Sequence, residues 1–294
     1  MKLSYLSTIL IVIFSIVTFF STNHNSESHT FHNDLIQEKE IRFSNLRQLT
    51  FSGENAEAYF SSDGKKLIFQ SHDGHSLCDQ IYIMNIETGS TNMVSTGEGV
   101  TTCSYFVYPD CQKAIYASTH IGNKKCPEKP DYSMGYVWKL YPDYDVFLTD
   151  LKTKSLEQLT NSPGYDAEAT VAFNGSKIVY TSMVSGDLDI WTMDLDGKNK
   201  VQLTDELGYD GGAFFNNDAT KIVWRVYHPK TAEETQQYKN LLAQNSIRPM
   251  ALQIWTMDSD GSNKKQITNN GSANFGPYYF PTSDKIIFSS NLHD

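Results

Sequence analysis

The sequence predicts an all-β fold, a β-propeller of four-stranded antiparallel blades. Its clearest sign is an internal repeat, because the phrase Asp189–Gly197 (DIWTMDLDG) returns at Gln253–Gly261 (QIWTMDSDG). Weaker copies occupy residues 79–85 and 144–150. Repetition with a period of roughly 40–45 residues is typical of propeller blades, since one such unit buries its faces only by stacking on copies of itself.

A pair of residues, Leu, Val or Ile followed by Thr or Ser, marks the end of each unit. The five pairs are Leu49-Thr50, Val94-Ser95, Leu159-Thr160, Leu203-Thr204 and Ile267-Thr268. Successive pairs stand about 45 or about 65 residues apart, so two of the units carry a long insertion.

Within a unit, four strands are expected in order. A strand of small residues, such as Ala167–Val171, comes first and is followed by an Asp/Asn-Gly turn that supplies the positive φ of a tight hairpin. A β-branched and aromatic strand follows, the Asp-Ile-Trp-Thr-Met-Asp phrase is the third strand, and a short fourth strand ends at the next Leu-Thr pair. The expected second strands are Lys65–Phe69, Lys177–Tyr180, Lys221–Trp224 and Lys285–Phe288.

These motifs resemble the TolB-like, WD-related propeller repeats of bacterial envelope proteins. In that family a Pro-Asp-Gly-Lys turn follows the first strand, and an Asp-hydrophobic-Tyr/Trp-x-Met-Asp strand follows the second. The resemblance runs from about Leu49 to Phe288 and implies the fold, whereas it implies little about function because this propeller serves many roles. TolB itself carries an α/β domain ahead of its propeller. We expect no such domain here, so a role in envelope constriction is not carried over.

The number of blades follows from the two ends of the repeat region. The fifth repeat supplies two strands, and residues 41–49 read as a lone outer strand of the kind that completes the last blade of a closed ring. We therefore expect six blades in the complete ring, with about four and a half in this sequence. A five-bladed ring is the alternative.

The N-terminus reads as an export signal. Met1-Lys2 is basic, residues 5–20 are almost wholly apolar, and residues 21–23 are polar, which is the order of a secretory signal peptide. We expect residues 1–22 to be cleaved, with an uncleaved N-terminal anchor as the alternative. Residues 23–40 read as a flexible leader, and residues 41–294 as the propeller. The protein is expected in the periplasm or outside the cell, with membrane contact only through residues 5–20 if these are retained.

Charge limits the partners. The chain has a formal net charge of −10 at pH 7. A negative surface is repelled by nucleic-acid phosphates and by anionic lipids, so neither is an expected partner.

Two long insertions, residues 120–143 and 226–252, are expected on one face of the ring, where function usually concentrates. The first ends in an aromatic-rich stretch whose Tyr136, Trp138 and Tyr141 are candidate ligand contacts. The alternative is an apolar lid packed on its neighbours. The second contains a capping box, Thr231-x-x-Glu234, ahead of apolar residues at helical spacing, which predicts a short amphipathic helix that packs on the ring.

A second candidate site is the channel mouth. The positions eight residues before each hairpin turn are Asn55, Thr102, Asp166, Asp210 and Asn274, and Glu57 and Glu168 follow two places later. Such a ring of oxygen atoms suits Ca²⁺, with Asp166 and Asp210 as the candidate metal ligands, or a basic or hydroxylated ligand. The favoured alternative is that these side chains cap their own loops. No other cofactor is expected.

The four cysteines lack metal-ligand spacing. In an exported protein we expect one disulfide among Cys78, Cys103 and Cys126, with Cys78–Cys103 as first choice, and a free Cys111.

No catalytic motif is present. His72, His75, His120 and His228 follow second strands and suit a metal site only if they converge. The sequence therefore favours an exported, non-catalytic propeller that binds a protein or a small ligand, an envelope protein or a carbohydrate among them. The alternative is an enzyme, either a prolyl-oligopeptidase-like hydrolase with a downstream catalytic domain or a metal-dependent polysaccharide lyase.

Overall fold

The computed structural model describes residues 36, 38–39, 41–72, 78–128, 132, 135–282 and 284–292. The expected signal (1–22) and most of the expected leader (23–40) lie outside these residues. The chain divides into two compact units, residues 1–48 and 49–294. Within the described residues, no helix has the length and apolar character needed to cross a membrane.

The expected outer strand at 41–49 is not formed, and these residues contain only bends and irregular backbone. An outer strand is held by pairing with the third strand of its blade. Among the described residues, the fifth sheet contains no third strand for it to join.

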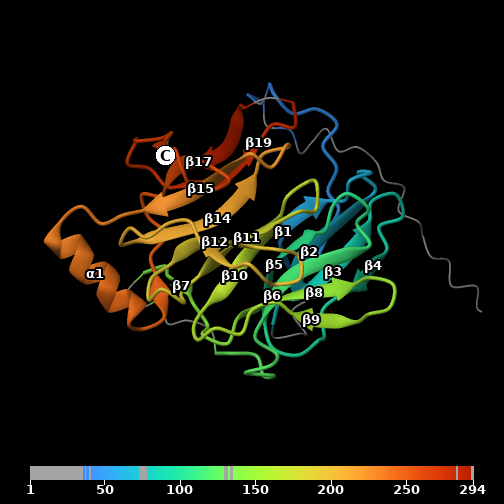
Figure 1. Ribbon diagram of the computed structural model, residues 1–294. Helices are drawn as coiled ribbons and strands as arrows, with labels where there is room; N and C mark the ends of the chain where they lie inside the picture. The colour runs from blue at the N-terminus through green and yellow to red at the C-terminus, as the bar shows by residue number, and fades with distance from the viewer. Residues whose placement is uncertain are drawn as a thin grey trace, which may run out of the picture. The chain divides into compact units, whose positions relative to one another are not determined.

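The second unit consists of four complete four-stranded blades and a two-stranded fifth sheet, as the repeats predict (Figure 1). Strands follow one another from the inside of each blade outward, and all pairs within them are antiparallel. Blade 1 contains β1 (Glu54–Phe60), β2 (Lys66–His72), β3 (Gln80–Asn85) and β4 (Thr91–Met93); blade 2 contains β5 (Thr101–Phe106), β6 (Lys113–Ser118), β8 (Asp145–Asp150) and β9 (Leu156–Gln158); blade 3 contains β10 (Asp166–Val171), β11 (Ile178–Ser182), β12 (Asp189–Met193) and β13 (Val201–Gln202); blade 4 contains β14 (Tyr209–Phe215), β15 (Lys221–Tyr227), β17 (Gln253–Asp258) and β18 (Lys265–Gln266); and the fifth sheet contains β19 (Asn274–Tyr279) and β20 (Ile286–Ser290).

The repeated phrase has a structural cause. In the four complete blades, the hydroxyl of the closing Leu-Thr or Val-Ser pair donates to the first side chain of the third strand and accepts from the next backbone amide. In blade 3, Thr204 Oγ1 lies 3.1 Å from Asp189 Oδ1 and 2.9 Å from Ile190 N. The same contacts join Thr160 to Asp145 in blade 2 and Thr268 to Gln253 in blade 4. The repeat therefore begins with Asp or Gln and ends with Thr or Ser because the two side chains fasten the outer strand.

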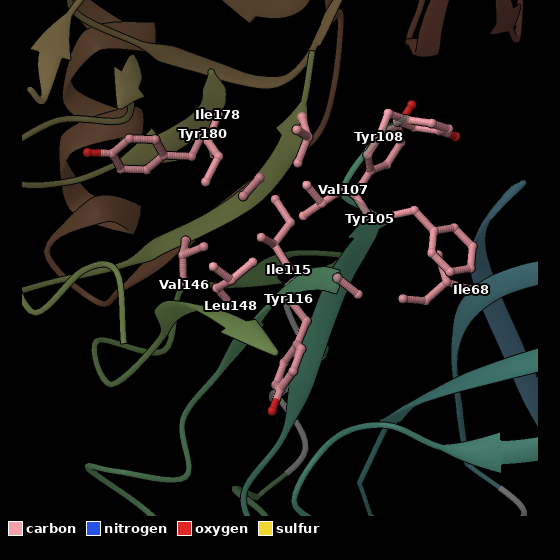
Figure 2. Close-up of a cluster of buried hydrophobic side chains, with 14 of the residues drawn as sticks. Ile68, Tyr105, Val107, Tyr108, Ile115, Tyr116, Val146, Leu148, Ile178 and Tyr180 are labelled. Carbon is pink, nitrogen blue, oxygen red and sulfur yellow. The ribbon is translucent and has the colours of Figure 1, made fainter. Parts of the chain in front are cut away.

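Inner strands pack on one another in chain order, from β1 to β5, β10, β14 and β19. The main apolar core fills the spaces between blades, and Figure 2 shows Ile68 of β2, Ile115 of β6 and Ile178 of β11 within it. Four aromatic side chains, from three blades and the fifth sheet, meet near the axis, and we call them the axial cluster: Tyr59, Tyr105, Phe214 and Tyr278.

Both insertions come together on one face, as expected. Trp138–Lys139 of the first insertion (β7) pairs with Ser246–Ile247 of the second (β16), and we call this two-stranded sheet the strap. The expected helix is α1 (Ala232–Leu242), which begins at Thr231 with the capping box in place. Its buried residue is Tyr238, whose hydroxyl donates to Asp187 of blade 3. The helix thus packs on the ring and positions the second half of the strap (Figure 1).

Candidate functional site

A cavity of about 640 Å³ lies between the inner strands and the strap. Every inner strand contributes to its wall. Trp138 and its neighbours in the first insertion also line it, and so does Ile247 in the second insertion. Tyr59 and Phe214 of the axial cluster also contribute, so the cavity lies on the loop side of the cluster.

A β-bulge occurs at the same place in all five inner strands and shapes this wall. The first bulged residue has a positive φ in every case, between 50° and 60°. These residues, which we call the bulge ring, are Glu57, Cys103, Glu168, Gly212 and Gly276, and all five line the cavity. A bulge re-aims the side chain it carries, and three of the five positions keep a side chain in a conformation that favours glycine.

Glu168 is the centre of a buried hydrogen-bond network. The residue is 9% exposed, and its carboxylate accepts from Thr181 Oγ1 (2.8 Å), from the Tyr209 hydroxyl (3.0 Å) and from the backbone amide of Gly212 (2.8 Å). Arg225 Nη2 lies 3.2 Å from Glu168 Oε1. The carboxylate is therefore fully engaged with protein groups.

Arg225 is held between two aromatic rings. Its guanidinium carbon lies 5.3 Å from the ring centre of Trp138 in the strap and 5.8 Å from that of Tyr209, in cation–π contacts. Nη2 also donates to the Tyr209 hydroxyl, whereas the buried Nε has no hydrogen-bond partner among the described residues. A Cβ at Gly212 would lie 2.1 Å from Arg225 Nη2, so this bulge position needs glycine to admit the guanidinium.

The two other side chains of the bulge ring differ in exposure. Glu57 is exposed and accepts from the Tyr59 hydroxyl at 2.7 Å. The Cys103 thiol has its pKa raised by burial first, and then by the negative charges of Glu57 and Glu168. This thiol therefore stays protonated at neutral pH.

Of the five positions eight residues before each hairpin turn, Thr102 lines this cavity, whereas Asn55, Asp166, Asp210 and Asn274 do not. Asp210 is fully buried and accepts from Trp224 Nε1 (2.6 Å) and pairs with His228 Nε2 (3.0 Å), while Asp166 accepts from Ser162 Oγ (2.6 Å). Asn55 bonds Ser71, and Asn274 donates to the carbonyl of Leu252 at 2.7 Å. The partners of Asp166 and Asp210 are side chains, and not the backbone amides of their own loops that the capping alternative expects.

The bulge-ring positions that line the cavity lie one or two residues after the five positions expected at the mouth. Of the candidates near the mouth, Glu57 and Glu168 do line the cavity, as do Tyr136, Trp138 and Tyr141 of the first insertion. Sequence reasoning missed Arg225, Tyr209 and Cys103. The available signal was their place in the repeat, since Cys103 occupies the same repeat position as Glu57 and Glu168.

The described histidines lie in different blades. His72 is near Glu54 (3.4 Å), His120 bonds Ser118 (2.8 Å), and His228 contacts Asp210 and Glu206. His75 lies outside the described residues. Among the residues the structure describes, no three His, Cys, Asp or Glu side chains gather in a way that suits a metal ion.

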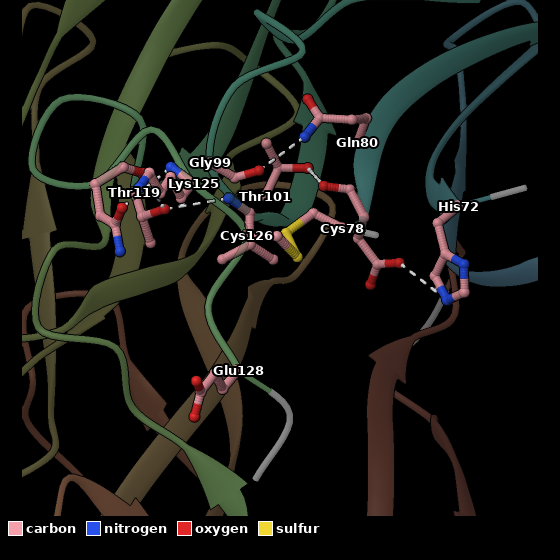
Figure 3. Close-up of a disulfide and its surroundings, with 12 residues drawn as sticks. His72, Cys78, Gln80, Gly99, Thr101, Thr119, Lys125, Cys126 and Glu128 are labelled. Carbon is pink, nitrogen blue, oxygen red and sulfur yellow. Dashed lines mark hydrogen bonds and ion pairs between the residues drawn. A yellow bond between two sulfur atoms is a disulfide. The ribbon is translucent and has the colours of Figure 1, made fainter. Parts of the chain in front are cut away.

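A disulfide joins Cys78 to Cys126, with their Cα atoms 5.5 Å apart (Figure 3). It ties the loop before β3 in blade 1 to the first insertion. The first-choice pair, Cys78–Cys103, is therefore wrong, because the bulge turns Cys103 into the cavity wall. Cys103 and Cys111 are both free.

No protein-family model matches the sequence, and a comparison with curated proteins finds no match either. Solved structures do share the fold. A putative TolB from Agrobacterium tumefaciens aligns with a TM-score of 0.54 and 16% identity over 71% of this chain and 63% of its own. TolB from Acinetobacter baumannii aligns with a TM-score of 0.57 and 16% identity, over 78% and 47%. Hydrazine synthase from Kuenenia stuttgartiensis aligns with a TM-score of 0.60 and 13% identity, over 85% and 38%.

These alignments confirm a TolB-like β-propeller fold. The chain spans 63% and 47% of the two TolB structures, and at such identities the likeness concerns the fold alone.

Proposed function

We propose that this TolB-like propeller is an exported, non-catalytic binding protein that takes a small ligand in the cavity beneath the strap. The observation that carries the proposal is the bulge ring. Glu57, Cys103 and Glu168 have φ values of 50–54°, where a residue with a side chain costs of the order of 1–3 kcal/mol. Strain of this kind at neighbouring positions around one cavity supports a functional use of the side chains it aims.

The chemistry of the wall favours binding over catalysis. A nucleophilic cysteine needs a lowered pKa, whereas burial and two nearby acids raise that of Cys103. Glu168 and Arg225 are committed to each other and to Tyr209. Such a preorganised wall suits a ligand that is held without being transformed.

Export is supported by two independent features. The N-terminal residues have the order of a secretory signal, and Cys78–Cys126 is a bridge that forms and persists in oxidising compartments. We therefore place the protein in the periplasm or outside the cell.

The test is a thermal-shift screen of the purified chain with neutral sugars, amino acids, carboxylates and organic amines. A ligand at a hundredfold excess over its Kd stabilises the fold by roughly 2.7 kcal/mol, which raises the melting temperature. Trp138→Ala removes the strap ring that covers Arg225 and should abolish the shift. Phe280→Ala, which removes a ring outside the cavity wall, should leave it unchanged.

The proposal fails if no compound shifts the melting temperature, or if a shift survives Trp138→Ala. If the chain binds only a protein partner, and Trp138→Ala does not weaken that binding, the function belongs to another surface. Turnover of a bound compound would instead favour the enzyme alternative.

A further inference from the structure

Of the five charged side chains of the cavity wall, three lie within 4 Å of an ionisable partner, and two, Lys139 and Glu57, do not. Arg225 and Glu168 pair with each other at 3.2 Å. Lys139 Nζ donates to the carbonyl of Gln244, and Asp79 accepts from Gln70 Nε2 at 2.9 Å and lies 3.9 Å from His72. Lys139 is held by a backbone carbonyl, whereas Glu57 remains to be explained.

Glu57 is an acid without an ion-pair partner among the described residues, although its charge helps to raise the pKa of Arg225. Its hydrogen-bond partner is the neutral Tyr59 hydroxyl, and no Lys, Arg or His of the described chain forms an ion pair with it. Its backbone is held at φ 54°, although Gly212 and Gly276 fill the equivalent place in two other blades. The ring therefore keeps a carboxylate at a strained position on the wall and leaves it without a direct ion pair.

The cavity is also lined by many aromatic rings. These are Tyr59, Tyr132, Tyr136, Trp138, Tyr141, Tyr144, Tyr165, Tyr209, Phe214 and Phe275. Two of them, Trp138 and Tyr209, already hold the Arg225 guanidinium, which shows that rings of this wall accept a cation. The net charge of −10 further raises the local concentration of cations at such a cleft.

Hydroxyl-rich ligands suit the wall less well, because most of its polar side chains are occupied. Gln70 bonds Asp79, Thr102 and the amide of Cys103, while Thr170 donates to the carbonyl of Ala213. Tyr209 and Glu168 are committed to each other. A sugar needs several free donors and acceptors, whereas an organic cation needs one carboxylate and ring faces.

We propose that the ligand of this cavity is a small organic cation, a protonated or quaternary amine recognised by the Glu57 carboxylate and the surrounding rings. The proposal rests on the proposed function, since it names the ligand class of the same cavity. Glu57 supplies the charge, Trp138 and its neighbours supply ring faces, and the Arg225–Glu168 pair fixes the wall behind them.

The experiment is calorimetric titration of the purified chain with choline and with spermidine. The neutral carbon isostere of choline, 3,3-dimethylbutan-1-ol, separates charge from shape. We expect at least one cation to bind, with choline about tenfold or more tighter than its isostere if choline is the one. Glu57→Gln keeps the acceptor for Tyr59 and should weaken cation binding by about tenfold or more. Glu87→Gln, at an exposed acid in the turn after β3, should leave it unchanged.

The remaining outcomes contradict an organic cation as the ligand, and they can be told apart. If neither cation binds, or if choline and its isostere bind equally, the class is wrong. The binding function still stands if some neutral compound binds in a manner lost with Trp138→Ala. Cation binding that survives both Glu57→Gln and Trp138→Ala lies outside this cavity and contradicts the proposal. Melting curves of the variants confirm that each is folded.

Discussion

At the scale of single residues, one backbone conformation is used with different side chains around the bulge ring. The left-handed conformation is common to all five positions, whereas the side chain is Glu, Cys or Gly. The two glycines have different surroundings, because a Cβ at Gly212 would meet Arg225 and one at Gly276 would meet no atom within 4 Å. The same substitution at the two positions therefore separates backbone strain from steric conflict.

We predict that Gly276→Ala lowers the free energy of unfolding by about 1 kcal/mol, the cost of a Cβ in the left-handed region. Gly212→Ala should lose about 1–3 kcal/mol more, because the added methyl group displaces the Arg225 guanidinium from Glu168 and Tyr209. Urea unfolding of the two variants measures both values. Equal losses would show that Gly212 is not needed to admit Arg225.

The contributions of two histidines to the stability of the fold should change with pH in opposite directions. Burial lowers the pKa of His228, but Asp210 and Glu206 raise it on balance above the ordinary value of 6.5. Its stabilising contribution is then fully present below about pH 6.5 and is lost as the pH rises through the folded-state pKa. Burial lowers the pKa of His120, so its contribution is present above pH 6.5 and is lost as the pH falls.

Unfolding free energies at several pH values check this pair. The cost of His228→Gln should shrink from pH 5.5 to pH 9, while the cost of His120→Gln should grow over the same range. Parallel trends in the two variants would contradict the assignment of charges around His228.

At the scale of elements, local signals predicted the strands and the helix but not the strap. Alternation, Asp-Gly turns and a capping box are short-range features, so β11, β12 and α1 could be placed from sequence. The strap pairs two residues with two others more than a hundred positions away, and neither segment differs from an ordinary loop. The disulfide partner of Cys78 lies in the same insertion, so Cys126 was among the expected candidates but was not the first choice.

We predict that the Cys78–Cys126 bridge contributes about 2–4 kcal/mol, because it closes a loop with a sequence separation of 48 residues in the unfolded chain. Replacing both cysteines by serine should lower the unfolding free energy by that amount and remove its sensitivity to dithiothreitol. Cys111→Ser, at a free cysteine, is the matched control and should keep the sensitivity. A bridge without effect on stability would mean that the insertion is held by its other contacts.

At the scale of the whole propeller, the repeat made the fold predictable, while the site depends on what each blade places at one position. The four blades and the two-stranded fifth sheet follow the repeat, and six blades in a complete ring remains a prediction. The cavity wall combines Glu57, Glu168 and Arg225 from three blades with Trp138 from an insertion. The repeat marks the inner-strand positions, but no local pattern records which side chains the blades and the insertion bring together there.

Contacts across the axis join blades that do not follow one another in sequence. Sequential packing links each inner strand to the next, but the hydroxyls of Tyr105 in blade 2 and Tyr278 in the fifth sheet lie 3.0 Å apart. Burial raises the pKa of both phenols, so both are neutral and one donates to the other. The axial cluster thus couples the two sides of the propeller through a hydrogen bond as well as through ring packing.

A double-mutant cycle measures that coupling. Tyr105→Phe and Tyr278→Phe should each destabilise the fold by about 1–2 kcal/mol, since each leaves the other hydroxyl without its partner. The double variant should cost less than the sum, with a coupling energy of about 0.5–1.5 kcal/mol in urea unfolding. The control cycle pairs Tyr278→Phe with Tyr116→Phe, whose ring packs on Phe147 within blade 2, and it should be additive. Additivity in the first cycle would show that the blades are joined across the axis by packing alone.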